Sequence, residues 1–146
     1  MKYSLANYII SFQADDPRLQ PYFANFSIGG QGSMLGSITV DYKEDLFTTE
    51  TFETGGWVHN KNLSKVGTVT LNISQLSVAV AKLKQLCNYF YDVENYEGFT
   101  ISVDDTAGNN VCVCKDCYPT KIPQQSLQGT AQRQDWAFTS GEVTFA

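Results

Sequence analysis

Short stretches in which apolar and polar residues alternate dominate this chain. The most regular one covers residues 68–73, where Val69, Leu71 and Ile73 are separated by polar side chains. Similar stretches lie at residues 8–12, 37–42, 99–104 and 135–145. Alternation with a period of two places one face of a β-strand against a core. The pattern therefore predicts a mostly β fold, either a β-barrel or a β-sandwich.

One segment departs from the alternation and predicts a single helix at about residues 76–91. Its apolar residues recur every three or four positions; they are Leu76, Val80, Leu83, Cys87 and Phe90. This spacing places apolar side chains on one face of an α-helix. Ser74 or Ser77 can cap the helix by accepting a hydrogen bond from a free backbone amide. We expect this single helix to pack across the β-barrel or sandwich.

Residues 43–56 interrupt the strand pattern and predict a long loop. Leu46, Phe47 and Phe52 occur there without a regular period, among acidic and threonine residues. Loops of this length in a small domain are usually functional or flexible, and exposed apolar side chains indicate a contact surface. The alternative is that these side chains fold back under the loop as a small cluster. The sequence favours neither interpretation over the other.

Length and charge limit the architecture and the partners. The 146 residues suit a single domain over residues 1–146. A net charge of −5 does not suit a protein that binds nucleic-acid phosphates or an anionic membrane. The chain has no apolar run long enough for a membrane span, and its N-terminus lacks the pattern of a signal peptide. Charged residues are only 17% of the chain, which suits a surface buried against copies of itself.

Three of the four cysteines lie close together, at Cys112, Cys114 and Cys117. Thiols at this spacing resemble half of a zinc site, with Cys87 or the single histidine, His59, as the fourth ligand. A second pair at zinc spacing is missing, however, and alternate positions on a strand share one face. We therefore expect small buried or interfacial thiols and no bound metal.

The sequence contains no pattern that supports catalysis. A Cys/His pair would need His59 beside a cysteine and a third orienting group, and nothing in the sequence places them together. The GxSxG motif of serine hydrolases is also missing. A run of carboxylates over residues 92–105 has no basic residue within it; the acidic side chains of interest are Glu94, Glu97, Asp104 and Asp105. We interpret them as an acidic surface, and we expect neither enzyme activity nor a cofactor.

Several of these features together resemble the bacteriophage tail tube proteins, which are the inner tube subunits of phage tails, especially contractile ones. The resemblance is strongest over residues 45–77, where a long irregular loop precedes a G-x-V-T-hydrophobic strand that ends in Q-x-S before the helix. Those positions are held by Gly67, Val69, Thr70, Leu71, Gln75 and Ser77. The strand at residues 135–138 (DWAF) and the order of elements are also similar. The cysteine cluster and residues 15–22 have no counterpart in the family pattern.

The resemblance implies a β-barrel or sandwich with one flanking helix, as in the related tube protein of type VI secretion. It also implies that Val80, Leu83 and Phe90 of the helix pack on Val69, Leu71 and Ile73 of the sheet. It also implies homohexameric rings that stack into a tube, through which DNA passes transiently during ejection. Sheath, tape measure and baseplate proteins would be further partners, with assembly in the host cytoplasm and a final location in the virion. The loop would join one ring to the next through a set of candidate contacts; these are Asp45, Leu46, Phe47, Phe52 and Trp57. The acidic side chains would line the lumen or the outer surface, and an acidic wall would repel DNA.

Three other functions are compatible with the same sequence features. A tube-initiating baseplate ring or a tail-completion protein would use the same fold but would not polymerise. A small-ligand-binding β-barrel would close its own barrel around an apolar cavity. A small metalloprotein would use the cysteine cluster and would purify with bound zinc.

Overall fold

The computed structural model of the chain describes residues 4–24, 26–29 and 35–146. In chain order the elements are η1 (Leu5–Asn7), β1 (Tyr8–Gln13), α1 (Gln20–Phe23), β2 (Ser27–Gly29), β3 (Leu35–Tyr42), β4 (Phe47–Thr51), β5 (Trp57–Lys61), β6 (Gly67–Ser74), α2 (Val78–Asp92), β7 (Phe99–Asp105), β8 (Asn110–Pro119) and β9 (Arg133–Phe145). The predicted mostly β fold with one main helix is confirmed.

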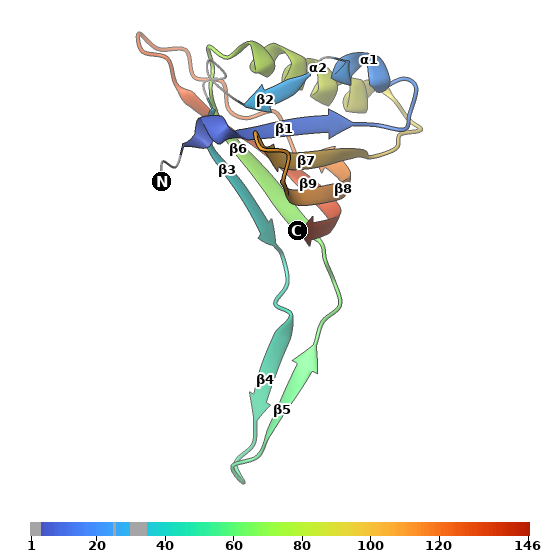
Figure 1. Cartoon of the computed structure of the whole chain (residues 1–146), viewed down its shortest axis with the longest axis vertical. Helices are drawn as coiled ribbons and strands as arrows, with labels where there is room; N and C mark the ends of the chain where they lie inside the picture. The colour runs from blue at the N-terminus through green and yellow to red at the C-terminus, as the bar shows by residue number, and fades with distance from the viewer. Residues whose placement is uncertain (1–3, 25, 30–34) are drawn as a thin grey trace.

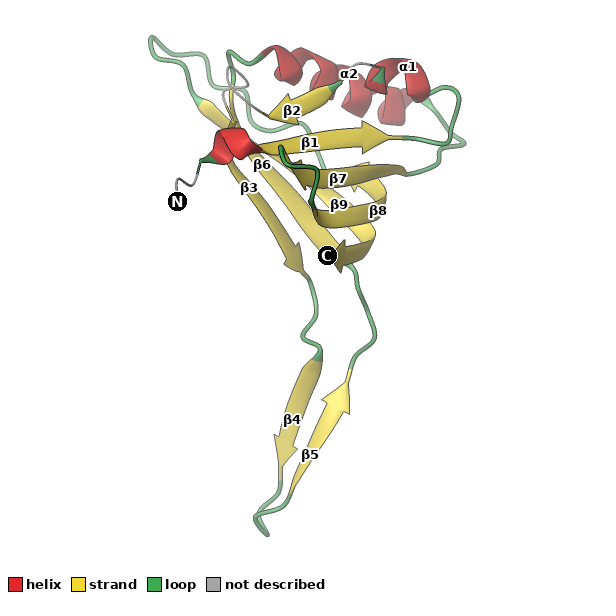
Figure 2. Cartoon of the chain, in the orientation of Figure 1, coloured by secondary structure: helices red, strands yellow, loops and turns green. Residues whose placement is uncertain are grey.

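Seven strands form one antiparallel sheet in the order β2-β1-β7-β8-β9-β6-β3. The sheet curls into a half-barrel, and β2 and β3 form its two edges (Figure 1). The other two strands, β4 and β5, pair with each other and extend well beyond this sheet (Figure 2). No helix in the described part of the chain is long and apolar enough to cross a membrane.

Helix α2 begins at Val78, slightly later than the residue pattern predicts. The backbone of Ser77 is extended, and its hydroxyl accepts a hydrogen bond from the Ala79 amide at 3.3 Å, so Ser77 is the N-cap. Leu76 therefore precedes the helix, and 64% of its surface is exposed. The helix continues to Asp92, one residue past the predicted end.

The inner face of the sheet and one face of α2 form a single hydrophobic core. Five residues of the expected helix–sheet contact are buried in it; they are Val69, Leu71, Ile73, Val80 and Leu83. Phe90 is partly buried at the edge of this cluster. Trp136 and Phe99 are its largest fully buried side chains, and the ring of Phe99 is 5.9 Å from that of Phe138.

A β-bulge in β8 explains why all three clustered cysteines face the core. Ile101 pairs with Cys114 and Phe99 pairs with Cys117, so β8 has one more residue than β7 between these pairs. Asp116 has a φ of 55°, which is unusual for a residue with a side chain. The bulge thereby turns Cys117 to the same side as Cys112 and Cys114, which alternation alone does not predict.

Candidate functional site

Residues 43–66 form a long β-hairpin, which we call the arm. The segment that the sequence suggests as a loop at about 43–56 thus contains β4 and the turn, and β5 completes the hairpin. The strands pair from Phe47–Lys61 to Thr51–Trp57. The turn is closed by a hydrogen bond from the Phe52 amide to the Gly56 carbonyl at 2.9 Å, and Gly55 adopts the positive φ of +89° that this turn requires.

Every residue of the arm is exposed. Among the predicted contact residues, Leu46 is 59% exposed, Phe47 54%, Phe52 50% and Trp57 67%. These side chains therefore do not fold back into a cluster under the loop, and that alternative interpretation is wrong. The arm presents them to solvent, as a contact surface would.

The arm carries apolar side chains on both of its faces. Because paired residues share a face of the hairpin, Phe47 and Trp57 lie on one face, at opposite ends of the β4–β5 ladder. Val58 pairs with Glu50 and lies on the other face. Leu46 joins Val58 there, since the Asn62 amide bonds to the Leu46 carbonyl at 2.8 Å and continues the ladder. A hairpin that packed on one surface would need apolar residues on one face only.

The junction between the arm and the sheet, which we call the neck, is hollowed. Tyr42 fixes the end of β3 by donating a hydrogen bond to the Val143 carbonyl at 2.9 Å and by packing its ring on Phe145. Beyond it lies a hollow of about 340 Å³ whose lining includes Tyr42, Leu46 and Leu63. Leu63 is 78% exposed. The neck, made of residues 42–46 and 61–65, therefore exposes two leucines next to the hairpin, and Glu44, Lys61 and Lys65 line the same hollow.

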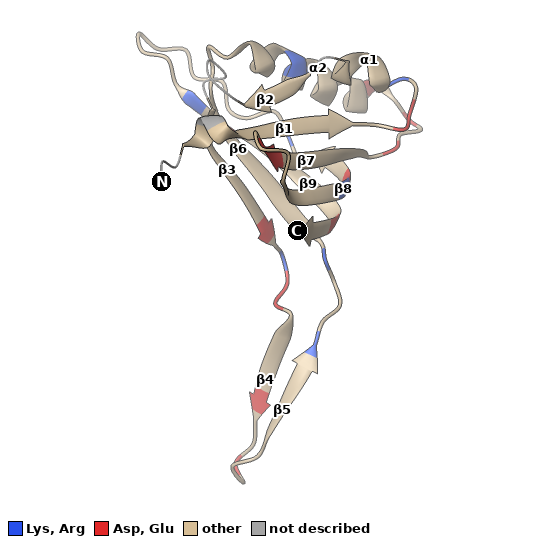
Figure 3. Cartoon of the chain, viewed as in Figure 1, with Lys and Arg blue, Asp and Glu red and all other residues tan. Residues whose placement is uncertain are grey.

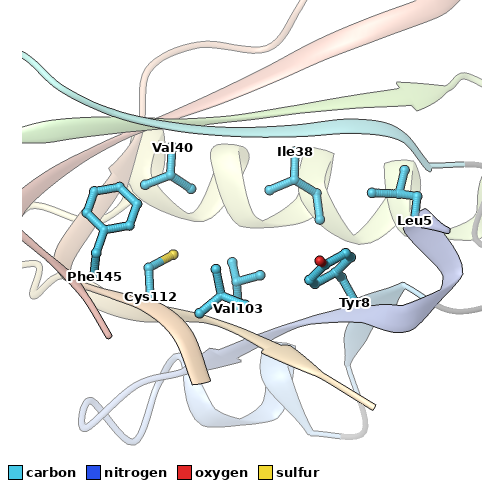
Figure 4. A pocket seen from close by; sticks show the side chains of 8 residues that line it. Leu5, Tyr8, Ile38, Val40, Val103, Cys112 and Phe145 are labelled. Atoms are coloured by element: carbon cyan, nitrogen blue, oxygen red, sulfur yellow. The ribbon is translucent and has the colours of Figure 1, made fainter. Parts of the chain in front are cut away.

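A separate apolar hollow of about 250 Å³ lies on the inner face of the half-barrel (Figure 4). Ile38 and Val40 of edge strand β3 face Tyr8 and Val103 across it. Within the residues that the structure describes, the sheet does not close around this hollow, because β3 and β2 are separate edges. The arrangement thus lacks the closed barrel that a small-ligand-binding protein of this kind would need.

The family is shown by a match over most of the chain. Residues 24–145 match the family model described as "Bacteriophage PhiTE tail tube protein". The chain belongs to this family. It is therefore a structural, non-enzymatic phage tail component of the tail tube family, as the resemblance implies. No curated protein matches the chain significantly.

Solved structures with the same fold come from contractile injection systems. The chain is similar to the sheath/tube terminator of the PVC extracellular contractile injection system, with 11% identity, coverage of 100% and 97% of the two chains and a TM-score of 0.55. The tube-terminating cap of the anti-feeding prophage AFP gives 13% identity, 100% and 93% coverage and a TM-score of 0.55. A chain of the PVC sheath–tube complex gives 13% identity, 99% and 91% coverage and a TM-score of 0.58. At these identities the likeness shows the fold alone.

The structure does not bring the four acidic candidates of this tail tube family member together. Glu94 and Glu97 are exposed in the connection that precedes β7, whereas Asp104 and Asp105 end that strand. Asp105 has a local role, because its carboxylate accepts hydrogen bonds from the amides of Ala107 and Asn109 at 3.0 and 2.8 Å and so stabilises the β7–β8 turn. Figure 3 shows acidic residues in several separate places, and no single acidic patch forms from this set.

All four cysteines are buried, and none of them forms a disulfide bond. Burial raises the pKa of Cys87 and of Cys117 to about 11. A hydrogen bond with Cys112 raises the pKa of Cys114, and the same bond lowers that of Cys112. His59 lies on the arm, where it is hydrogen-bonded to Thr49 at 2.8 Å. In the described ranges, no three His, Cys, Asp or Glu side chains are placed to hold a metal ion.

Residues 15–22, which have no counterpart in the family pattern, contain a local ion pair between Asp16 and Arg18 that is hydrogen-bonded to α2. Asp16 is only 5% exposed and accepts hydrogen bonds from the Arg18 side chain and amide and from the Tyr89 hydroxyl. The hydrogen bonds from Arg18 hold the pKa of Asp16 below its usual value. Sequence reasoning missed this link, although the D-P-R spacing suggests a local carboxylate–guanidinium pair. It lies before residue 24, where the family match begins.

Proposed function

We propose that this tail tube protein is the repeating subunit of the inner tube of a phage tail. Six copies form a ring, the rings stack, and DNA passes through the lumen during ejection. The observation that carries the proposal is the arm, whose apolar side chains are exposed on both faces in the single chain. An isolated two-stranded hairpin is only marginally stable in water, so the arm needs a partner surface.

The open edges of the sheet support ring formation. Strands β2 and β3 each pair on one side only within the described residues. Unpaired edge strands readily hydrogen-bond to other chains unless they are covered. In a ring, the β3 edge of one subunit pairs with the β2–β1 edge of its neighbour, so the half-barrels join into a continuous wall around the lumen.

The charge of the chain is compatible with transient DNA passage. A net charge of −5 repels the phosphates of DNA and opposes binding within the tube. Glu94, Glu97, Asp104 and Asp105 remain the proposed lumen or surface acids, although they act as separate sites. Sheath, tape measure and baseplate proteins are the proposed partners, with assembly in the host cytoplasm and no cofactor.

A second candidate function is a ring that begins, ends or completes the tube on the same fold. It is favoured by two of the structural neighbours, which are a sheath/tube terminator and a tube-terminating cap. Such a protein would stop at a single ring, whereas a tube subunit polymerises. Negative-stain electron microscopy beside a sizing column separates the two: tubes support the main proposal, single rings support the second, and a strict monomer contradicts both.

The role of the arm is tested by the double variant Phe47→Asp/Phe52→Asp. Both positions are exposed in the single chain, so the variant should fold normally by circular dichroism. Burying two unpaired charges in an interface costs on the order of several kcal/mol. We therefore expect this variant to form no tubes. The matched control is Gln85→Asp/Asn88→Asp, which places two new charges on exposed positions of α2. Normal tubes from the arm variant would remove the arm from the interface.

A further inference from the structure

The end of the molecule opposite the arm carries an uncharged surface with exposed apolar side chains. Strand β6 runs from Gly67, which pairs with Ser140 beside the neck, to Ser74, which pairs with Arg133 at the other end. We call this other end the far end; it comprises Gln75, Leu76, Val78, Leu127, Gln128 and Gln132. Figure 1 shows the β8–β9 connection, residues 120–132, extending from the body on the side away from the arm.

The far end exposes large aliphatic side chains in a charge-free setting. Val78 and Leu127 are each 89% exposed and Leu76 is 64% exposed. No charged residue occurs in residues 68–81 or 122–132. Depletion of charge around exposed apolar side chains is typical of the centre of a protein interface, not of a free surface.

Hydrogen bonds hold this surface in a fixed shape. The Gln75 amide bonds to the Gln132 carbonyl at 2.9 Å, and the Gln132 amide bonds to Gln75 Oε1 at 2.8 Å. Gln132 Nε2 also donates to Gln128 Oε1 at 3.3 Å, and Gln128 Nε2 donates to Ser126 Oγ at 2.9 Å. The β8–β9 connection, which carries Leu127, is therefore tied to the segment that precedes α2. A preorganised surface loses less entropy when it binds.

The neck is the complementary surface at the opposite end. Its hollow of about 340 Å³ has Leu46 and Leu63 in its lining, and Leu63 is 78% exposed. Glu44, Lys61 and Lys65 also line this hollow, so charged groups surround its two leucines. Two different surfaces at opposite ends of one chain suit a head-to-tail contact, which repeats without closing. A self-complementary contact between two identical ends would need only one of them.

The length of the arm indicates which part of it meets the far end. Residues 43–54 span about 40 Å when extended, whereas the eight residues of β6 span about 26 Å. When the base of the arm contacts the far end of a subunit in the next ring, an arm of this length carries its tip past that far end and along the side of that subunit. The neck, at the base of the arm, is left to contact the far end of that subunit.

We infer that the far end of one subunit packs into the neck of a subunit in the adjacent ring, with Leu127 and Val78 against Leu46 and Leu63. The inference rests on the proposed function and specifies which surfaces join the rings. It assigns a binding role to the β8–β9 connection, which lies far from the arm in the chain. Each subunit then contributes one surface to the ring above it and the other to the ring below.

Cysteine cross-linking tests this pairing, because the native thiols are all buried. The double variant Leu63→Cys/Leu127→Cys should form tubes and, on mild oxidation, a ladder of covalent oligomers that extends beyond the hexamer. Each single variant alone should stay monomeric on a non-reducing gel. A mixture of the two single variants, combined before assembly, should give dimers only.

The matched control is Thr54→Cys/Leu127→Cys, which moves the first thiol to the tip of the arm. This pair should give no ladder, because the tip lies beyond the far end of the next subunit. A ladder from this control, or self-dimers from Leu127→Cys alone, would overturn the inference. So would a Leu63→Cys/Leu127→Cys protein that forms tubes without cross-links.

The variant Leu127→Asp separates the inference from the function on which it depends. Leu127 makes no buried contact in the single chain, so the variant should fold and form rings that do not stack. Tubes of normal length from Leu127→Asp would contradict the inference but leave the tube function intact. Wild-type protein that forms neither rings nor tubes would contradict the proposed function and, with it, the pairing of these two ends.

Discussion

The two tryptophans show how differently the body and the arm use the same residue type. Trp136, in β9, is fully buried, and its indole nitrogen donates to Gln134 Oε1 at 3.2 Å. Trp57, in β5, is 67% exposed. The body, meaning the seven-stranded sheet with its helices, buries its apolar residues within the single chain. The arm leaves its own apolar residues exposed.

This difference separates two kinds of stability. The body contains the hydrophobic core, and its burial stabilises the single chain. The arm contributes no side chain to that core, so in the proposed tube its apolar residues would stabilise the assembled state and not the single chain. Changes in the body should therefore act on folding, and equivalent changes in the arm should act on assembly.

The largest expected difference comes from truncating the two tryptophans. Trp136→Ala removes the largest fully buried side chain and should lower the free energy of unfolding by about 3–5 kcal/mol. Trp57→Ala should change it by no more than about 0.5 kcal/mol, because the side chain is exposed. Urea unfolding of both, in the assembly-defective Phe47→Asp/Phe52→Asp background, measures these values on the single chain.

Assembly should respond to the two tryptophans in the opposite way. In the otherwise wild-type chain, Trp57→Ala should reduce tube formation on electron microscopy while leaving the far-ultraviolet circular dichroism unchanged. A large loss of folding stability from Trp57→Ala would show that the arm packs on its own body. If Trp136→Ala prevents folding altogether, the milder Trp136→Phe should still unfold at a lower urea concentration than wild type.

A pair of glycines gives a smaller but similar contrast. A Cβ at Gly67, where β6 leaves the arm, would lie 2.4 Å from the Asp41 carbonyl oxygen and 2.7 Å from a methyl group of Val143. Gly67→Ala should therefore cost about 1–3 kcal/mol of folding stability through overpacking. At Gly56, in the arm turn, the nearest atom to an added Cβ belongs to Phe52 at 3.8 Å. Gly56→Ala should be within about 0.5 kcal/mol of wild type, and equal effects at both sites would contradict the contrast.

The body was largely predictable from the sequence because its strands have one buried face. Val69, Leu71 and Ile73 alternate with exposed or half-exposed residues, and the core accounts for that alternation. The bulge at Asp116 was not predictable, because it breaks the period of two. The sequence predicted buried or interfacial thiols, but it did not predict that Cys117 shares a face with Cys112 and Cys114. Long-range contacts such as that between Asp16 and Tyr89 leave no periodic pattern.

The arm was harder to predict for a physical reason. Its strands carry apolar residues on both faces, so neither a period of two nor one of 3.6 emerges from the sequence. The residue pattern therefore left open whether its apolar residues form a contact surface or fold back under the loop, and it predicted a loop where β4 and β5 form a hairpin. The far end was missed because its two segments are distant in the chain and are joined only in the fold, by the hydrogen bonds between Gln75 and Gln132.

The smallest expected contrast concerns two serines that cap local turns. Ser77 Oγ accepts a hydrogen bond from the Ala79 amide in a buried position at the start of α2. Ser77→Ala should therefore lower the free energy of unfolding by about 1 kcal/mol, as is usual for loss of an N-cap. Ser64 Oγ accepts from the Val66 amide at 3.4 Å on the exposed arm, so Ser64→Ala should change that free energy by less than about 0.5 kcal/mol. Ser77→Thr, which keeps a capping hydroxyl, should recover most of the loss. If Ser64→Ala destabilised the single chain as much as Ser77→Ala, the arm would be part of the folding unit and the division between folding and assembly would fail.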